Sequence, residues 1–332
     1  MFAPNILVTN YCNQKCPFCF AKQEMENVKL SREMSVKEYK KIVLILKKDK
    51  NIRTIKLLGG EPTLHTHLFD IIDFAIQNGF DLQIFTNGII DNKKIETLMM
   101  YGKKIAYILN VSTPGYQLNQ KLRTVVDSNM EILSSKSPIT LSVTLDPFFQ
   151  PEYFLKQVRV GILGVASHIR IGLGNPISGK KNWYSFEQFP RIGTQTVKLI
   201  QLARQSGFKG VFHLNCGFTR CMFTNEEYDI LKGAVSSIGW SCFGKESTMD
   251  ISTNLDAFHC FPLANYRRYN IDKKGYLESH RALTKMRLVL WSKLKMKYCV
   301  KCPFYGFGQE KCPGPCLAFR MNENANLKQY II

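Results

Sequence analysis

Short apolar runs of β-type composition alternate with stretches of helical periodicity over the first half of the chain. Runs of this kind predict strands, and six of them lie at Asn5–Thr9, Thr54–Leu58, Leu82–Phe85, Ala106–Val111, Thr140–Leu145 and His168–Gly172. Repeated alternation of strand and helix predicts a parallel sheet with right-handed crossovers. The expected fold class is therefore α/β, as an open or closed barrel.

Local signals mark where the first helices begin and end. Ser35 and Glu38 form a capping-box sequence ahead of an apolar stripe that ends at Leu46, which predicts a helix start here. The dipeptide Asn78-Gly79 follows a second helical stretch, as expected at a helix C-terminus.

The pattern changes between residues 180 and 215. One more helix is predicted at Thr194–Arg204, but the segment after it is irregular and holds eight of the 11 cysteines. We therefore expect two domains, residues 1–210 with the sheet and residues 211–332 with the cysteine-rich segment.

Composition and charge narrow the class of protein. The 332 residues include 45 Lys+Arg and 26 Asp+Glu, a net charge of +19, and 45% are hydrophobic, as in a globular protein. This positive charge is explained either by lysines on solvated helix faces or by the binding of an acidic peptide or a small anionic substrate. The basic residues are dispersed and no zinc-finger or RNP-like spacing occurs, so nucleic acid is not the expected partner.

The sequence predicts no membrane span and no secretion signal. No run of about 18 apolar residues occurs, and the N-terminal MFAPNILVTNYC lacks a basic n-region and a long apolar h-region. We expect a cytoplasmic protein without membrane contact. In that compartment the 11 cysteines are better explained as metal ligands than as disulfides.

Three cysteines follow the first strand with the spacing C-x3-C-x2-C, namely Cys12, Cys16 and Cys19. Such closely spaced thiolates can hold three corners of an iron–sulfur cubane and leave one iron open, whereas structural zinc takes four protein ligands. Because loops after parallel strands meet at one edge, we expect this loop to share a cavity with the segments that follow the next strands, 59–62, 86–88 and 110–114.

The segment Gly59-Gly60-Glu61-Pro62 follows the second strand. Two glycines let the backbone approach a ligand closely, and their carbonyls can accept hydrogen bonds from an ammonium group. Glu61 either adds a charge-assisted contact or fixes the loop.

The cysteine loop, with Phe18 before its third cysteine and the glycine-rich segment after the second strand, resembles the radical S-adenosylmethionine (SAM) enzymes over residues 5 to about 175. The resemblance implies a partial (β/α)6 barrel and a [4Fe–4S] cluster on Cys12, Cys16 and Cys19 that chelates the amino and carboxylate groups of SAM. It implies cleavage of SAM to methionine and a 5′-deoxyadenosyl radical that abstracts a substrate hydrogen atom. The residues expected to contact SAM are Phe18, Gly59, Gly60, Glu61, Pro62, Asn110 and Ser112.

Eight cysteines remain, the ligand count for two further [4Fe–4S] clusters: Cys216, Cys221, Cys242, Cys260, Cys299, Cys302, Cys312 and Cys316. Residues 249–259 predict a hairpin with Asn254 near its turn. The run C-x2-C-x9-C-x3-C from Cys299 to Cys316 resembles the SPASM extension of radical SAM enzymes that modify peptides and proteins, or its one-cluster relative, the twitch extension.

The chain departs from the usual SPASM pattern in three places. The x9 gap is wider, Leu255 replaces a glycine five residues before Cys260, and no cysteine follows Cys316. By analogy, one auxiliary cluster would use Cys242, Cys260, Cys316 and either Cys216 or Cys221. The second would hold Cys299, Cys302 and Cys312, with Cys216, Cys221 or a non-cysteine group as the open fourth ligand.

Other roles stay open for some of these residues. Zinc in the C-terminal run is the alternative metal. Cys216 or Cys221 could instead donate a hydrogen atom to a substrate radical. His259 and His280 are expected to be surface or packing residues.

The resemblance implies an enzyme that acts on a peptide or protein substrate by crosslinking, thioether formation or α-carbon epimerisation. Phe261-Pro262 replaces the acidic base that sulfatase-activating relatives carry after the second extension cysteine, which argues against that activity. An electron donor such as flavodoxin or ferredoxin is implied. The chain starts directly at the first strand, so leader binding would need a separate protein.

Two alternatives remain, the first of them also an enzyme and the second from another class of protein. One is the twitch-type oxidation or epimerisation of a small molecule such as an aminosugar. The other is a non-catalytic iron–sulfur or zinc protein that binds nucleic acid, but such a protein has no need of the Gly59–Pro62 segment.

Overall fold

The computed structural model describes residues 3–27, 29–158, 164–176, 183–236, 238, 240, 249–307 and 311–323. Two units can be distinguished within the chain. The first comprises Met1–Lys15, Cys19–Ile139 and Lys245–Val289, and the second comprises Cys16–Phe18, Thr140–Gly244 and Leu290–Ile332. Cys242 lies outside the described residues.

The first unit is built on a sheet in which neighbouring strands follow the order β10-β9-β8-β1-β2-β3-β4. The strands are β1 (Asn5–Thr9), β2 (Thr54–Gly59), β3 (Asp81–Thr86), β4 (Ile105–Asn110), β8 (Asp250–Ile251), β9 (Asp256–Phe258) and β10 (Tyr269–Asn270). β1 to β4 are parallel, and β8 joins β1 in parallel. β9 is antiparallel to both β8 and β10.

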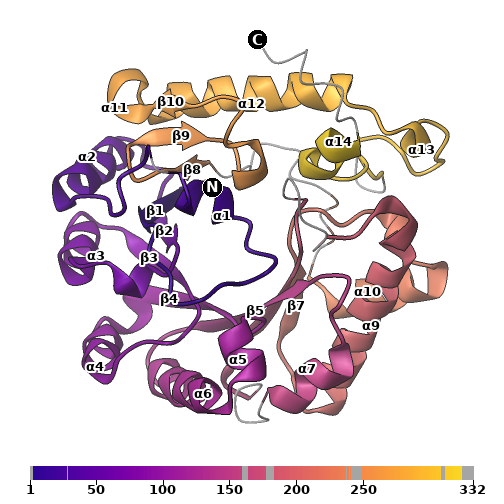
Figure 1. The fold of residues 1–332 in the computed structure, drawn as a ribbon, viewed down its shortest axis with the longest axis horizontal. Helices are drawn as coiled ribbons and strands as arrows, with labels where there is room; N and C mark the ends of the chain where they lie inside the picture. Colours follow the sequence, from indigo (N-terminus) through magenta and orange to yellow (C-terminus); the bar gives the residue numbers. More distant parts are fainter. Residues whose placement is uncertain are drawn as a thin grey trace. The chain divides into compact units, whose positions relative to one another are not determined.

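Helices connect these strands and cover the sheet of the first unit. They are α1 (Lys22–Met25), α2 (Val36–Lys47), α3 (Leu68–Gln77), α4 (Asn92–Met100), α5 (Pro114–Leu118), α6 (Gln120–Ser134), α11 (Ile271–Lys274) and most of α12 (Tyr276–Lys293), with 3-10 turns η1 (Pro62–Leu64), η2 (Gly102–Lys104) and η5 (Phe261–Leu263). α2, α3, α4 and α6 follow one another along the outside of β1 to β4 (Figure 1). Each presents an apolar stripe inward, which in α2 consists of Tyr39, Ile42, Val43 and Leu46.

The second unit contains three parallel strands among its described residues, β5 (Ile139–Leu145), β6 (His168–Leu173) and β7 (Val211–Leu214). Its helices are α7 (Pro151–Gln157), α9 (Phe189–Gln205), α10 (Asn225–Ala234), α13 (Lys297–Val300) and α14 (Leu317–Glu323), with 3-10 turns η3 (Phe186–Gln188) and η4 (Arg220–Met222). α9 packs against α7 and α10 and buries apolar residues such as Ile192, Leu199 and Ile200.

The α/β class and the parallel strands predicted from the sequence are confirmed. The six predicted strands are β1 to β6, and no predicted strand end is off by more than one residue. The capping box of Ser35 and Glu38 is formed at the start of α2, and Asn78 is the C-cap of α3. The helix predicted at Thr194–Arg204 is the inner part of α9, which starts earlier because Pro190 suits a first helical turn.

Within the described part of the chain, no helix is both long and apolar enough to cross a membrane.

Candidate functional site

The first cysteine loop begins at the end of β1 and is fastened to the end of β2. The N–H of Gly60 donates to the carbonyl of Thr9 at 2.7 Å, and the N–H of Glu61 donates to the carbonyl of Tyr11 at 2.7 Å. The glycine-rich segment therefore holds the chain directly before Cys12.

Side chains of the loop itself reach the ends of the next two strands. Asn13 accepts a hydrogen bond from the Asn87 side chain, after β3, at 2.7 Å. Gln14 accepts one from the N–H of Gly115, after β4, at 2.8 Å. As expected, the loops that follow β1, β2, β3 and β4 lie together in the first unit.

Gly60 is required by the close packing of the cysteine loop. A Cβ atom on Gly60 would lie 2.1 Å from the carbonyl oxygen of Tyr11 and 3.0 Å from the Cβ of Cys12. A Cβ atom on Gly59 would lie 2.1 Å from the Thr9 carbonyl oxygen. No side chain fits in either space, so both glycines allow the loop to pack against β2.

The carboxylate of Glu61 is buried, with 1% of the residue exposed. Its Oε1 accepts hydrogen bonds from the N–H and hydroxyl of Thr63 at 3.2 and 2.8 Å and from the hydroxyl of Thr86 at 2.8 Å. Its Oε2 accepts from the N–H of Asn87 at 2.7 Å. Burial raises the pKa of Glu61, while these donors act to lower it. Of the two roles considered above, the contacts favour fixing the loops.

Cys12 and Cys19 lie in the first unit, and Cys16 belongs to the second. Cys12 and Cys19 are half-buried, and Cys19 packs against an apolar cluster that includes Leu7 and Phe261. Burial raises the pKa of Cys12 to about 11, and the nearby Glu61 and Cys19 act in the same direction. A thiolate at this position therefore needs a cation, which an iron–sulfur cluster supplies.

The remaining SAM-contact candidates lie at several points of the fold. Asn110 ends β4 and its Oδ1 accepts a hydrogen bond from the N–H of Ser112 at 3.0 Å. Pro62 is buried and opens η1. Phe18 is buried and belongs to the second unit. Their contacts with SAM stay predictions.

Four of the other cysteines form a group within the second unit. Cys299 interacts electrostatically with Cys221, Cys302 and Cys312, and Cys221 also does so with Cys302. Cys221 lies in η4 and Cys299 in α13. We call Cys221, Cys299, Cys302 and Cys312 the four-cysteine group.

Backbone hydrogen bonds shape the chain around this group. The Sγ of Cys312 accepts from the N–H of Arg220 at 3.5 Å and from the N–H of Gly314 at 3.4 Å. The Cys302 N–H donates to the Cys299 carbonyl at 3.1 Å. Two N–H donors aimed at one sulfur suit a thiolate that carries negative charge.

Arg320 in α14 is fully buried and holds the chain between the last two cysteines. It donates hydrogen bonds to the carbonyls of Pro315 at 2.8 Å and Leu294 at 3.0 Å, and to that of Pro313. Burial raises the pKa of Cys299 to about 11, and the positive charge of Arg320 acts in the opposite direction. The guanidinium thus favours a thiolate at Cys299.

The other auxiliary cysteines, Cys216, Cys260 and Cys316, are not members of the four-cysteine group. Cys216 is exposed and interacts electrostatically with the half-buried Arg170 of β6. Cys316 is buried and precedes α14. Cys260 belongs to the first unit, so the ligand set of Cys242, Cys260 and Cys316 suggested by analogy stays a prediction.

Among the described residues, no three His, Cys, Asp or Glu side chains are arranged to share one metal ion. The thiolates of a [4Fe–4S] cluster stand at the corners of a cubane and are spaced more widely than the ligands of a single ion. His259 is buried, and burial together with Arg287 and His280 lowers its pKa to about 3. This neutral histidine fits the packing role expected for it.

Sequence analysis did not find the polar residues that hold the two cysteine groups. Asn13, Gln14 and Asn87 act through contacts between segments distant in sequence. Arg220 and Arg320 are buried, although arginine is usually exposed. The only signal was their position next to cysteines, since each lies one or four residues from a cysteine of the C-terminal half.

Comparison with known proteins supports the resemblance in the first half of the chain. Residues 6–133 match the model of the radical SAM superfamily. The chain is 34% identical over 84 residues to an S-adenosylmethionine-dependent nucleotide dehydratase of Selenomonas ruminantium, a match that covers 25% of this chain and 29% of that protein. It is 38% identical over 89 residues to a probable GTP 3′,8-cyclase of Saccharolobus islandicus, covering 26% of this chain and 27% of that protein.

The chain thus spans less than a third of each of these two relatives. Among solved structures, SuiB of Streptococcus suis bound to S-adenosylmethionine has a TM-score of 0.69 at 18% identity, covering 97% of this chain and 75% of SuiB. SuiB bound to its precursor peptide SuiA gives a TM-score of 0.68 at 16% identity, covering 97% of this chain and 74% of SuiB.

The likeness to SuiB concerns the fold, and it agrees with the α/β class and partial (β/α)6 barrel expected from the sequence. The match to the superfamily model covers the cysteine loop, the glycine-rich segment and the strands β1 to β4. Residues 6–133 are thus similar to the radical SAM superfamily.

Proposed function

We propose that this protein reductively cleaves SAM and uses the resulting radical to abstract a hydrogen atom from a peptide or protein substrate. The observation that carries the proposal is the cysteine loop, which Gly60 and Glu61 fasten to β2 within the radical SAM domain. The similarity of residues 6–133 to the radical SAM superfamily implies a [4Fe–4S] cluster and SAM as cofactors.

The cysteine loop and the segments that follow β2 and β4 fit this pair of cofactors. Cys12, Cys16 and Cys19 would supply three thiolates, and SAM would complete the coordination of the fourth iron. The bound cluster supplies the electron that cleaves SAM. Glu61 positions the ends of β2 and β3 around the site through its four hydrogen bonds. The backbone of Gly59 and Gly60, and the side chains of Asn110 and Ser112, are the proposed SAM contacts.

A peptide substrate is supported by two observations. SuiB, whose fold is similar over 97% of this chain, has been solved with its precursor peptide. The net charge of +19 suits an acidic peptide. Crosslinking, thioether formation and α-carbon epimerisation are the reactions we propose, with an electron donor such as flavodoxin or ferredoxin.

We further propose that residues 211–332 carry auxiliary [4Fe–4S] chemistry, as in SPASM proteins. The four-cysteine group offers one complete ligand set, because its thiols already interact within one unit. Cys221 would then be the fourth ligand left open by sequence analysis. Cys216 would be either the fourth ligand of a cluster on Cys242, Cys260 and Cys316 or a hydrogen donor.

The proposal is tested by anaerobic reconstitution. Dithionite-reduced protein should convert SAM to 5′-deoxyadenosine, whereas the triple variant Cys12→Ala, Cys16→Ala and Cys19→Ala should not. That variant should keep the iron of the auxiliary sites. Cleavage of SAM by the triple variant would show that the site is assigned to the wrong cysteines.

A nucleotide substrate is the second candidate function. It is favoured by the names of the two relatives above, a nucleotide dehydratase and a GTP cyclase. A panel of acidic peptides and nucleoside triphosphates distinguishes the two. A peptide substrate should raise 5′-deoxyadenosine formation above the uncoupled background, and a rise with nucleotides alone would replace our proposal.

A further inference from the structure

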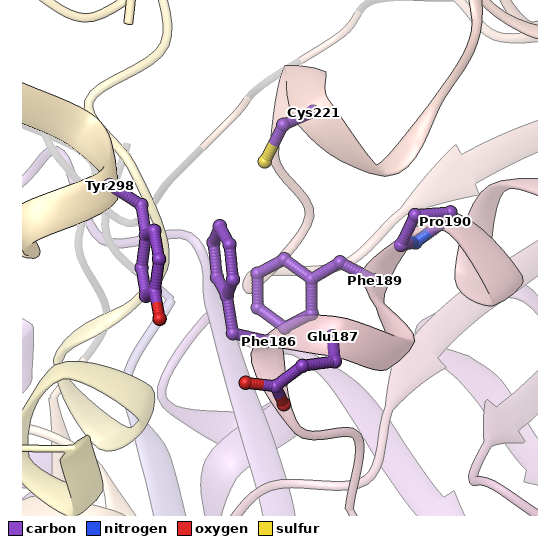
Figure 2. A pocket seen from close by; sticks show the side chains of 6 residues that line it. All are labelled: Phe186, Glu187, Phe189, Pro190, Cys221 and Tyr298. Atoms are coloured by element: carbon purple, nitrogen blue, oxygen red, sulfur yellow. The ribbon is translucent and has the colours of Figure 1, made fainter. Parts of the chain in front are cut away.

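Within the four-cysteine group, Cys221 is the member that reaches the surface. Its residue is exposed, whereas Cys299 and Cys312 are buried and Cys302 is half-buried. Cys221 lines a pocket of about 400 Å³, and its sulfur points toward the aromatic side chains there (Figure 2). A redox centre held by the group would therefore be nearest to solvent at Cys221.

Aromatic side chains form the wall of this pocket. The rings of Phe186 and Tyr298 are stacked with centroids 4.2 Å apart and an interplanar angle of 8° (Figure 2). Phe189 lies next to Phe186 at 5.1 Å. Glu187 is the acidic residue among those that line the pocket. Hydrogen bonds to its carboxylate lower its pKa, and the positive charge of Lys297 lowers that pKa further.

The segment that carries Cys299 and Cys302 also exposes large apolar side chains. The exposed fractions are 44% for Tyr298, 61% for Val300, 42% for Phe304 and 58% for Phe307. Single exposed apolar residues are common, but several along one short segment mark an interaction surface.

The same segment is strongly basic. Between residues 290 and 309 the sequence contains Lys293, Lys295, Lys297 and Lys301 and no Asp or Glu. All four lysines are exposed, and the Lys297 ammonium lies 4.9 Å from the centroid of the Tyr298 ring. An apolar surface is thus accompanied by positive charge.

We propose that this surface docks an acidic one-electron carrier protein, which exchanges electrons with the four-cysteine group through Cys221. The docking surface consists of Phe186, Tyr298, Val300, Phe304, Phe307, Lys297 and Lys301. In each transfer the reduced carrier loses one electron and the centre on the four thiolates gains it. No bond is formed or broken. The inference rests on the auxiliary cluster proposed above.

A carrier protein fits these features for physical reasons. Electron-transfer complexes use small, short-lived interfaces, for which a compact apolar patch is sufficient. Complementary charge speeds the encounter without requiring tight binding. Exposed lysines on the segment that carries Cys299 and Cys302 therefore favour an acidic carrier.

The test uses full-length anaerobic protein and a reduced, negatively charged [2Fe–2S] ferredoxin. Stopped-flow spectroscopy follows the oxidation of ferredoxin at increasing salt. The variant Lys297→Glu/Lys301→Glu should transfer electrons roughly tenfold more slowly at low salt, and the difference should shrink as salt screens the charges. Lys37→Glu/Lys93→Glu is the matched control, since both lysines are exposed on helices of the first unit.

Iron content and reduction by dithionite are measured first on every variant. If the four-cysteine group binds no cluster, these measurements reveal it, and the auxiliary site and the docking proposal both fail. If the iron is intact and the Lys297→Glu/Lys301→Glu variant keeps the wild-type ferredoxin rate, only the docking proposal is overturned. Weaker binding of an acidic peptide or of RNA with an unchanged ferredoxin rate would also overturn it and assign the surface to that ligand.

Discussion

Gly314 offers a direct test of how the four-cysteine group is built. It lies between Cys312 and Cys316 and has a φ of +81°, in the region that favours glycine. A Cβ atom there would lie 2.9 Å from Nη2 of Arg320 and 3.0 Å from Sγ of Cys299. The substitution Gly314→Ala therefore adds a methyl group between the buried guanidinium and the thiol.

The expected cost has two parts, and a second glycine separates them. Gly207 also has positive φ, +91°, but a Cβ atom there would meet nothing within 4 Å. Gly207→Ala should cost only the backbone strain, about 1–2 kcal/mol. Gly314→Ala should cost that strain plus about 1–3 kcal/mol of overpacking, because Arg320 and Cys299 are both buried and cannot yield freely.

The two variants are compared by thermal unfolding and by iron analysis under anaerobic conditions. Each kcal/mol should lower the thermal midpoint by about 2–4 °C, so Gly314→Ala should melt clearly below Gly207→Ala. It should also lose about four iron atoms per chain, while Gly207→Ala keeps them. Equal midpoints and equal iron for the two variants would refute the close packing of Gly314 against Cys299.

Three further outcomes are expected. Glu61→Gln should lower stability by about 1–3 kcal/mol and weaken SAM binding by calorimetry, because each carboxylate oxygen accepts a backbone N–H and an amide NH₂ would leave one of them unpaired. Burial raises the pKa of Asp250 to about 7, so the folded state binds the proton more tightly than the unfolded state does. The wild type should therefore lose stability relative to Asp250→Asn as the pH rises from about 4 to about 7, measured by urea unfolding. Cys221→Ser should remove about four iron atoms per chain if the four-cysteine group is the ligand set; an unchanged iron content would contradict that set.

The strands of the sheet could be predicted because their signal is local. Each of β1 to β6 is a short apolar run between polar or glycine-rich segments, and a buried parallel strand has this composition. The helix start at Ser35 could be predicted for the same reason, since the capping box depends on residues three apart. β7 was missed because Val211–Leu214 is too short to show a pattern.

Pairing between distant segments could not be predicted. The hairpin of β8 and β9 has the strands and turn expected for residues 249–259, but nothing in its sequence indicates that β8 joins β1 at Asn5 and Ile6. Leu255, where the SPASM pattern has glycine, has a φ of +66°. The backbone thus has the conformation that glycine favours, which the residue type alone would not indicate.

The candidate site shows the same division between local and distant information. The spacing of Cys12, Cys16 and Cys19 indicates chemistry because the three residues share one loop. The fourth member of the C-terminal group could not be chosen between Cys216 and Cys221, because both precede Cys299 by a long stretch of chain. The proximity of Cys221 to the other cysteines depends on the packing of η4 in the second unit.

The charges buried beside the two cysteine groups have opposite sign, and this has a consequence for metal binding. Burial dominates at both Cys12 and Cys299 and raises each pKa to about 11. Glu61 adds to that effect at Cys12, whereas Arg320 opposes it at Cys299. A fully thiolate-ligated cluster carries more negative charge than one with three thiolates, so a buried guanidinium is most useful beside four cysteines. At the three-cysteine loop, the positive charge that stabilises the thiolates has to come from the metal. This suits a cluster whose open iron also binds a carboxylate.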